Sequence, residues 1–222
     1  MNDCKSKKMT KDSANRSGQI SLPPRQDPGR MAHQKAVEAL SGQSVAQLQW
    51  LGADRSGAGW HLPVIDGVLL VDTTTGAVCR EGGGTARPAW QILALHYLAL
   101  RTRPLARPPE VTFASLPSAR VYAGVYENRV NRRLCAHVGN SVQLLRAAAA
   151  AIKAREVASG NATFEVDVFP RIPIRLIWYA GDEEFAPSCT LLLPANIESF
   201  FCIEDIVVLS ESLVSRLGGQ PF

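Results

Sequence analysis

The pattern of hydrophobic and polar positions divides the chain into a polar leader and a patterned body. Residues 1–30 are rich in Lys, Ser, Asn, Pro and Gly and have almost no aliphatic side chains. Such a segment cannot bury enough apolar surface to offset its loss of conformational entropy. We therefore expect 1–30 to be a disordered basic tail and 31–222 to be one folded domain. Met31 is a candidate alternative start, because helical periodicity begins directly after it.

Five segments of the body have the period or the propensity of helices: 36–40, 45–51, 89–101, 141–157 and 203–217. The segment 89–101 is apolar on nearly every side, so we expect a central helix there. The segment 203–217 carries an apolar stripe, and Glu204 and Asp205 lie in its first turn, where the helix dipole favours acidic groups.

Strand patterns occur between these helices, at 61–72 with a turn at Asp66-Gly67, and at 77–80, 163–169, 174–179 and 190–193. Residues 113–126 follow neither period clearly, and a short strand is one interpretation of them. The order of elements predicts an α+β domain in which a mostly antiparallel sheet packs against helices.

Composition excludes several classes of protein. The hydrophobic fraction of 46% is too high for a fully disordered chain, and the apolar runs fall short of the roughly 20 residues that span a bilayer. The first thirty residues contain no apolar core of a signal peptide. Five cysteines without a C-x-x-C pair argue against a disulfide framework and a zinc ribbon, and fit reduced thiols. We therefore expect a cytoplasmic protein without a membrane span.

Charge is distributed unevenly along the chain. The net charge of +4 lies entirely in 1–30, whereas 31–222 is neutral. Within the body, 101–155 carries a net charge of +8 and 156–222 a net charge of −7. We favour mutual compensation of these segments within the fold over a basic face for an anionic ligand. Because the excess charge belongs to the tail, no specific nucleic-acid partner is predicted.

Common catalytic motifs are missing, which leaves three candidate clusters. No phosphate-binding loop, nucleophile elbow or H-E-x-x-H helix occurs. His96 lies within a predicted helix, where it is either a hydrogen-bonded core histidine or a ligand to a metal or a tetrapyrrole iron or cobalt. Arg129, Arg132 and Arg133 form either an anion-binding cluster or a solvated helix face.

The third cluster is the acidic turn Asp182-Glu183-Glu184. Its carboxylates could ligate a hard cation through oxygen, or pair with Arg171 or Arg175 on the preceding strand. Phe185 is expected to anchor this turn in the core. Trp178 and Tyr179 precede the turn, so an aromatic wall beside carboxylates would suit a planar ligand.

Several short motifs resemble a known family when they are taken in chain order: Leu95-His96-Tyr97-Leu98, Phe113-x-x-Leu116-Pro117, Phe169-Pro170-Arg171-Ile172-Pro173, Trp178-x-x-Gly181-Asp182-Glu183-Glu184-Phe185, Leu191-Leu192-Leu193 and Ile203-Glu204-Asp205-Ile206. Over roughly 32–217 the chain resembles the prokaryotic family called domain of unknown function 3786. Members of that family are sometimes joined to an iron–sulfur module of the corrinoid type, and this chain has no such Cys-rich module. The resemblance implies a neighbourhood of anaerobic cofactor metabolism, without a reaction or a catalytic residue.

Three functional hypotheses follow. The leading one is an accessory protein that binds a small-molecule ligand or cofactor, related to a tetrapyrrole or corrinoid. Its binding residues would be His96, Tyr97, Trp178, Asp182, Glu183 and Phe185. The alternatives are a protein-interaction or structural domain without a small-molecule site, and a metal-assisted hydrolase with His96, Asp182 and Glu184 as metal ligands. The binding and hydrolase hypotheses require His96 and Asp182 to face a common pocket. Neither a particular cofactor nor an oligomeric state is predicted.

Overall fold

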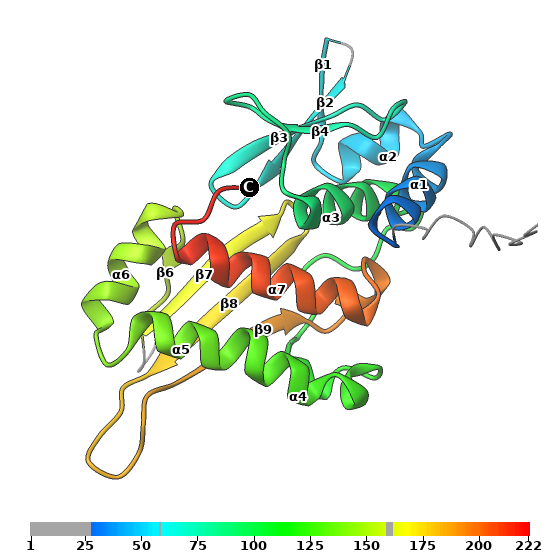
Figure 1. Ribbon diagram of the computed structural model, residues 1–222. Coiled ribbons are helices and arrows are strands. Elements are labelled where there is room, and N and C mark those ends of the chain that lie inside the picture. The colour runs from blue at the N-terminus through cyan, green and yellow to red at the C-terminus, as the bar shows by residue number, and fades with distance from the viewer. Residues whose placement is uncertain (1–27, 58, 159–161) are drawn as a thin grey trace, which may run out of the picture.

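Two antiparallel sheets form the framework of the protein in the computed structural model, which describes residues 28–57, 59–158 and 162–222 (Figure 1). The smaller sheet has four strands in chain order: β1 (Asp54–Ser56), β2 (Gly59–Val64), β3 (Gly67–Val71) and β4 (Val78–Arg80). The larger sheet has the order β5-β9-β8-β7-β6, with β5 (Glu110–Thr112), β6 (Arg155–Glu156), β7 (Ala162–Phe169), β8 (Ile172–Tyr179) and β9 (Ser188–Pro194). The predicted α+β class is confirmed, with two sheets in place of one.

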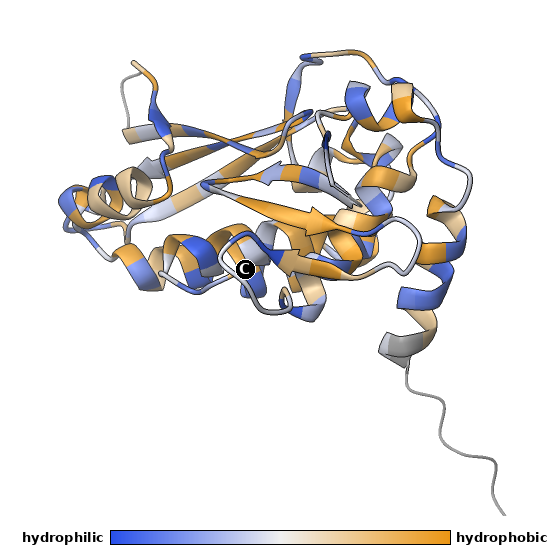
Figure 2. Cartoon of the chain, turned by 90° about the horizontal axis from the view of Figure 1, so that it is seen from above, coloured by the Kyte–Doolittle hydropathy of each residue, from blue (hydrophilic) through white to orange (hydrophobic). Residues whose placement is uncertain are grey.

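Seven α-helices are distributed along the described part of the chain. They are α1 (Pro28–Leu40), α2 (Val45–Trp50), α3 (Pro88–Ala99), α4 (Ala123–Tyr126), α5 (Arg132–Val138), α6 (Val142–Ala151) and α7 (Ile203–Leu217). Short turns complete them: η1 (Phe113–Ser115), η2 (Ala119–Val121), the π-helical η3 (Glu127–Asn131) and η4 (Ile197–Ser199). Helix α7 lies across one face of the larger sheet, with α5 and α6 beside it (Figure 1). Hydrophilic and hydrophobic residues alternate along these helices, as expected for half-buried segments (Figure 2).

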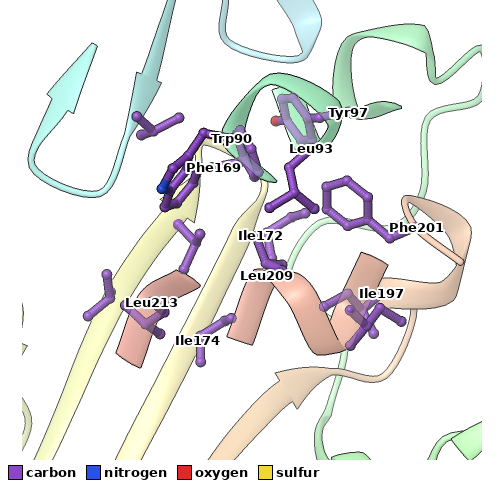
Figure 3. Close-up of a cluster of buried hydrophobic side chains, with 14 of the residues drawn as sticks. Trp90, Leu93, Tyr97, Phe169, Ile172, Ile174, Ile197, Phe201, Leu209 and Leu213 are labelled. Carbon is purple, nitrogen blue, oxygen red and sulfur yellow. The ribbon is translucent and has the colours of Figure 1, made fainter. Parts of the chain in front are cut away.

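The core forms where α3, α7 and the two central strands of the larger sheet meet. Trp90, Leu93 and Tyr97 project from α3 toward Phe169 at the end of β7 (Figure 3). Leu209 and Leu213 of α7 complete the same cluster, which also contains Ile172 and Ile174 of β8. Helix α3 is apolar on all sides because it packs against α1, α7 and the smaller sheet at once, as its sequence predicted.

Several predicted boundaries differ from the structure for local reasons. The helix predicted at 141–157 ends at Ala151, because Lys153 adopts a left-handed backbone (φ 56°) and Arg155–Glu156 pairs with β7 as β6. The segment 113–126 contains the turns η1 and η2 and helix α4, while the strand lies just before it, at β5.

The described part of the chain begins with α1. Most of the predicted tail, 1–27, lies outside the described residues, whereas 28–30 already belong to the first turn of α1. Strand β1, which pairs with β2 through Arg55 and Trp60, was not predicted from the sequence.

Opposite charges pair across the fold, as the charge distribution predicted. Arg129 and Arg133 both contact Glu211 of α7, and Arg155 contacts Glu165 and Asp167. Within the basic segment 101–155, Arg129, Arg133, Arg146 and Arg155 thus pair with carboxylates of the acidic C-terminal segment. Among the described helices, none combines the length and the apolar character that crossing a bilayer requires.

Candidate functional site

A groove of about 610 Å³ runs between α3, α7 and the η3–α5 segment. Its apolar walls come mainly from Trp90, Ile92 and Leu93 of α3 and from Val208 of α7, and Pro221 adds the C-terminal segment. The two principal helices lie side by side in Figure 1. This volume falls within the range of small-molecule sites in proteins, which is roughly 300–1,000 Å³.

Three guanidinium groups surround the groove. Arg87 is the residue directly before α3, whose first helical residue is Pro88. Arg129 comes from η3 and Arg133 from α5, and both form ion pairs with Glu211 of α7, Arg133 at 3.3 Å between Nη1 and Oε1. One turn of helix separates the two arginines, so their side chains share a face.

Two carboxylates, those of Asp205 and Glu211, also line the groove, which leaves one positive charge in excess. The first residues of α3 add backbone N–H groups and the positive end of the helix dipole. The arrangement can therefore accept an anionic group next to an apolar surface.

His96 reaches the edge of this groove through Asp205. Its Nδ1 lies 2.7 Å from Oδ2 of Asp205, and the two side chains are 31% and 14% exposed. Asp205 lies in the first turn of α7, where the helix dipole stabilises a carboxylate. A proton donated from Nδ1 to the carboxylate fixes the imidazole and leaves the Nε2 lone pair available, which is the arrangement typical of ligating or proton-accepting histidines. Asp205 lines the groove, whereas His96 itself does not.

Tyr97 is part of the core. Its side chain has no exposed surface, and its ring stacks on that of Phe169 with 4.5 Å between the centroids. The hydroxyl donates to the carbonyl of Leu51 (2.7 Å) and accepts from the backbone N–H of Arg171 (3.2 Å). Burial raises the pKa of Tyr97 far above its ordinary value, so this hydroxyl stays protonated. Tyr97 therefore joins elements of the fold and does not face the groove.

Trp178 and the acidic turn lie at the other end of β8. Trp178 is 5% exposed, and its Nε1 is buried without a hydrogen-bond partner among the described residues. The turn follows β8 and projects beyond the sheet, away from α3 (Figure 1). From Ile172, which is near Tyr97, to Tyr179 the strand advances by about 23 Å. His96 and Asp182 therefore do not share a pocket.

Within the acidic turn, the side chains stabilise the turn itself. Oδ1 of Asp182 accepts hydrogen bonds from the backbone N–H groups of Glu184 (2.9 Å) and Phe185 (2.7 Å). Phe185 is 68% exposed, so the expectation that it anchors the turn in the core was wrong. The turn between β8 and β9 projects beyond the helices that cover the sheet (Figure 1).

Arg171 and Arg175, the expected alternative partners of the acidic turn, form their contacts elsewhere. Arg171 donates through Nε to the carbonyl of Trp50 (2.8 Å), and Arg175 pairs with Glu165 on the neighbouring strand β7 and with Glu110 on β5. These contacts occur on the face of the larger sheet that carries Glu165 and Arg175, beside a second hollow of about 560 Å³. Four arginines and three carboxylates line that hollow, so it also has one positive charge in excess, but it lacks the wall of large apolar side chains that the groove has.

The predicted metal ligands are not brought together. His96 lies beside α7, and Asp182 and Glu184 lie in the β8–β9 turn. In the part of the chain that the structure describes, no three side chains of His, Cys, Asp and Glu are placed to hold a metal ion. The metal-assisted hydrolase hypothesis therefore has no metal centre among these residues.

The residues that connect the candidate clusters give no local signal in the sequence. Asp205 stands out in the sequence only by its place in a first helical turn, and Glu211 belongs to no motif. Both carboxylates line the groove. Only the packing of α7 on α3 and η3 reveals that Asp205 contacts His96 and that Glu211 contacts the arginines.

Comparisons with known proteins agree with the motif resemblance. Neither curated proteins nor solved structures include a match to this chain. One family model matches residues 46–216, a segment that extends from α2 to the last turn of α7. The chain therefore belongs to the family described as domain of unknown function (DUF3786).

Proposed function

We propose that this protein binds an anionic organic small molecule in the groove between α3 and α7. The observation that carries the proposal is the pairing of an apolar wall with Arg87, Arg129 and Arg133 around one hollow of about 610 Å³. Guanidinium groups match the planar geometry of carboxylates, and partial burial strengthens such pairs. The apolar wall would supply most of the binding energy and the arginines the orientation.

Glu211 has a specific role in this proposal. Its carboxylate holds Arg129 and Arg133 in place while the groove is free of ligand. A ligand carboxylate would share or replace these contacts, so the arginines need little reordering on binding. Because Glu211 is three-quarters buried and both arginines are about half exposed, a ligand can approach the guanidinium groups from the solvent side.

A tetrapyrrole is the specific candidate ligand. Molecules such as heme combine a planar apolar body with carboxylate side chains, and the groove offers an apolar wall and guanidinium groups that complement the two parts. His96 does not line the groove, but its Nδ1 contacts Asp205, which does, so ligation of iron or cobalt through Nε2 would require the imidazole to turn into the groove. When bound, the tetrapyrrole metal would supply an open coordination position. In this proposal the binding residues are His96 with Asp205 and the groove arginines, in place of Tyr97, Trp178 and the acidic turn.

The test is a visible-absorbance titration of the full chain with hemin and, separately, with cobalamin. We expect saturable binding with a shift of the absorbance band for one of the two. The double variant R129A/R133A should weaken binding at least tenfold, which corresponds to about 1.4 kcal/mol. The control is R132A, because Arg132 lies between them in sequence but is 72% exposed and pairs with Glu127.

The variant His96→Ala separates ligation from binding. If His96 ligates the metal, this variant changes the position of the absorbance band, whereas loss of Arg133 changes the affinity. Absence of saturable binding of both compounds refutes the tetrapyrrole assignment. Equal losses in R129A/R133A and R132A would show that the groove is not the site and would favour the protein-interaction alternative.

A further inference from the structure

Two cysteines meet between the larger sheet and the helix that covers it. Cys135 lies in α5 and Cys189 in β9, and their Sγ atoms are 2.7 Å apart although 54 residues separate them in the sequence. Both are free thiols in the structure. We propose that Cys135 and Cys189 are an oxidation site, at which a peroxide converts the two thiols into a reversible disulfide.

Formation of the disulfide requires little movement of the two sulfur atoms. A disulfide bond joins two sulfur atoms at about 2.05 Å, so the present separation must shorten by about 0.65 Å. The α5 helix packs directly on β9, and the two side chains already point toward each other across this interface. Most cysteine pairs in different elements would need a backbone shift before they could be joined.

The two cysteines differ in exposure, and this difference indicates which of them reacts with the peroxide first. Cys135 is partly exposed, whereas Cys189 is 5% exposed and donates its S–H to the backbone carbonyl of Asn131 (3.1 Å). Burial and the neighbouring Cys135 raise the pKa of the Cys189 thiol. Cys135, the more exposed of the two residues, therefore meets the oxidant, and Cys189 resolves the product.

The disulfide forms in two steps. The Cys135 sulfur attacks one oxygen of a hydroperoxide, the O–O bond breaks, and the products are a sulfenic acid and an alcohol, or water when the oxidant is hydrogen peroxide. The Cys189 sulfur then attacks the sulfenic sulfur, the S–O bond breaks, and water leaves with the Cys189 proton. Two electrons pass from the two thiols to the peroxide, and a dithiol reductant reverses the reaction by thiol–disulfide exchange.

The experiment uses the full chain with Cys202→Ser, because Cys202 is the exposed cysteine among those described and would complicate the product. The protein is treated with hydrogen peroxide, denatured, alkylated and analysed by mass spectrometry before and after dithiothreitol. Four thiols are expected before oxidation, since the sequence has five cysteines and one is replaced. Two thiols are expected afterwards, with a loss of about 2 Da and a cross-linked peptide that contains Cys135 and Cys189.

Two further measurements keep the proposal falsifiable. The cross-link closes a 54-residue loop, so the oxidised protein should melt roughly 10 °C higher than the reduced protein. Trp178, which is paired with Cys189 in the sheet register, should lose fluorescence on oxidation, and W178F should remove that change.

Cys79→Ser is the matched control, and it must leave the cross-link intact, because Cys79 lies in β4 of the other sheet. The proposal is overturned if all four thiols remain after peroxide treatment. It is equally overturned if Cys135 gains oxygen without forming a link, or if the linked peptides contain other cysteines.

Discussion

Replacement of Tyr97 by phenylalanine tests how the two sheets and the N-terminal helices are joined. The hydroxyl of Tyr97 bridges the carbonyl of Leu51, which follows α2, and the backbone N–H of Arg171, which lies in the turn between β7 and β8. Phenylalanine keeps the ring and its stacking on Phe169, so the substitution removes a single buried oxygen. Any loss of stability is then due to these two hydrogen bonds.

The expected loss of unfolding free energy depends on how deeply the two hydrogen-bond partners of Tyr97 are buried. A buried donor or acceptor that loses its partner costs about 1–3 kcal/mol. The bond to Leu51 is short at 2.7 Å and buried, and the bond from Arg171 is longer at 3.2 Å and only partly buried. We therefore expect Tyr97→Phe to lower the free energy of unfolding by about 2–4 kcal/mol. With a urea dependence of about 2 kcal/mol per molar, the midpoint should fall by about 1–2 M.

Urea unfolding followed by circular dichroism measures this change, and Tyr122→Phe is the matched control. Tyr122 donates its hydroxyl proton to Glu204 near the protein surface, so its removal should shift the midpoint much less. A Tyr97→Phe shift below about 0.3 M, or one no larger than that of the control, would refute the bridging role. Ligand binding in the groove should be unchanged, because Tyr97 does not line it.

Three further outcomes are expected. Burial raises the pKa of Tyr97 and Tyr126, so their contribution to stability is present below about pH 10 and is lost as the pH rises toward their folded-state pKa. The free energy of unfolding should therefore fall by as much as about 1.4 kcal/mol per pH unit for each tyrosine, and a constant value between pH 9 and 11 would contradict this. Phe169→Ala should cost about 3–5 kcal/mol in urea unfolding, whereas Phe185→Ala should stay within about 0.5 kcal/mol; similar values for both would show that burial is assigned wrongly. Gly76→Ala should destabilise the protein by at least about 1–3 kcal/mol, because Gly76 has φ +73° and a Cβ there would lie 2.1 Å from a side-chain carbon of α1; an unchanged melting temperature would refute the placement of α1.

The candidate clusters show where sequence patterns stop being informative. His96 and the arginines at 129 and 133 were singled out separately, and the structure connects each to a carboxylate of α7. The sequence separation between His96 and Asp205 is 109 residues, so no local spacing could indicate this pair. The acidic turn at 182–184 is conspicuous in the sequence, but the length of the β8–β9 hairpin places it at the far end of the sheet from His96.

The helix and strand boundaries illustrate a second limit. Helix α7 has the predicted bounds because its apolar stripe and its acidic first turn are local signals. The alanine-rich helix α6 ends six residues before the predicted end, because pairing of Arg155 and Glu156 with β7 overrides helix propensity there.

The sequence by itself determined the fold class, the central position of α3 and the compensation of its basic and acidic segments, since these depend on periodicity and on charge counts along the chain. Tertiary structure alone decided that Asp205 meets His96, that Glu211 meets the groove arginines and that Cys135 meets Cys189. The physical reason is that packing of α5 and α7 brings together side chains from segments 54 to 109 residues apart, and contacts at such separations leave no periodic trace in the chain.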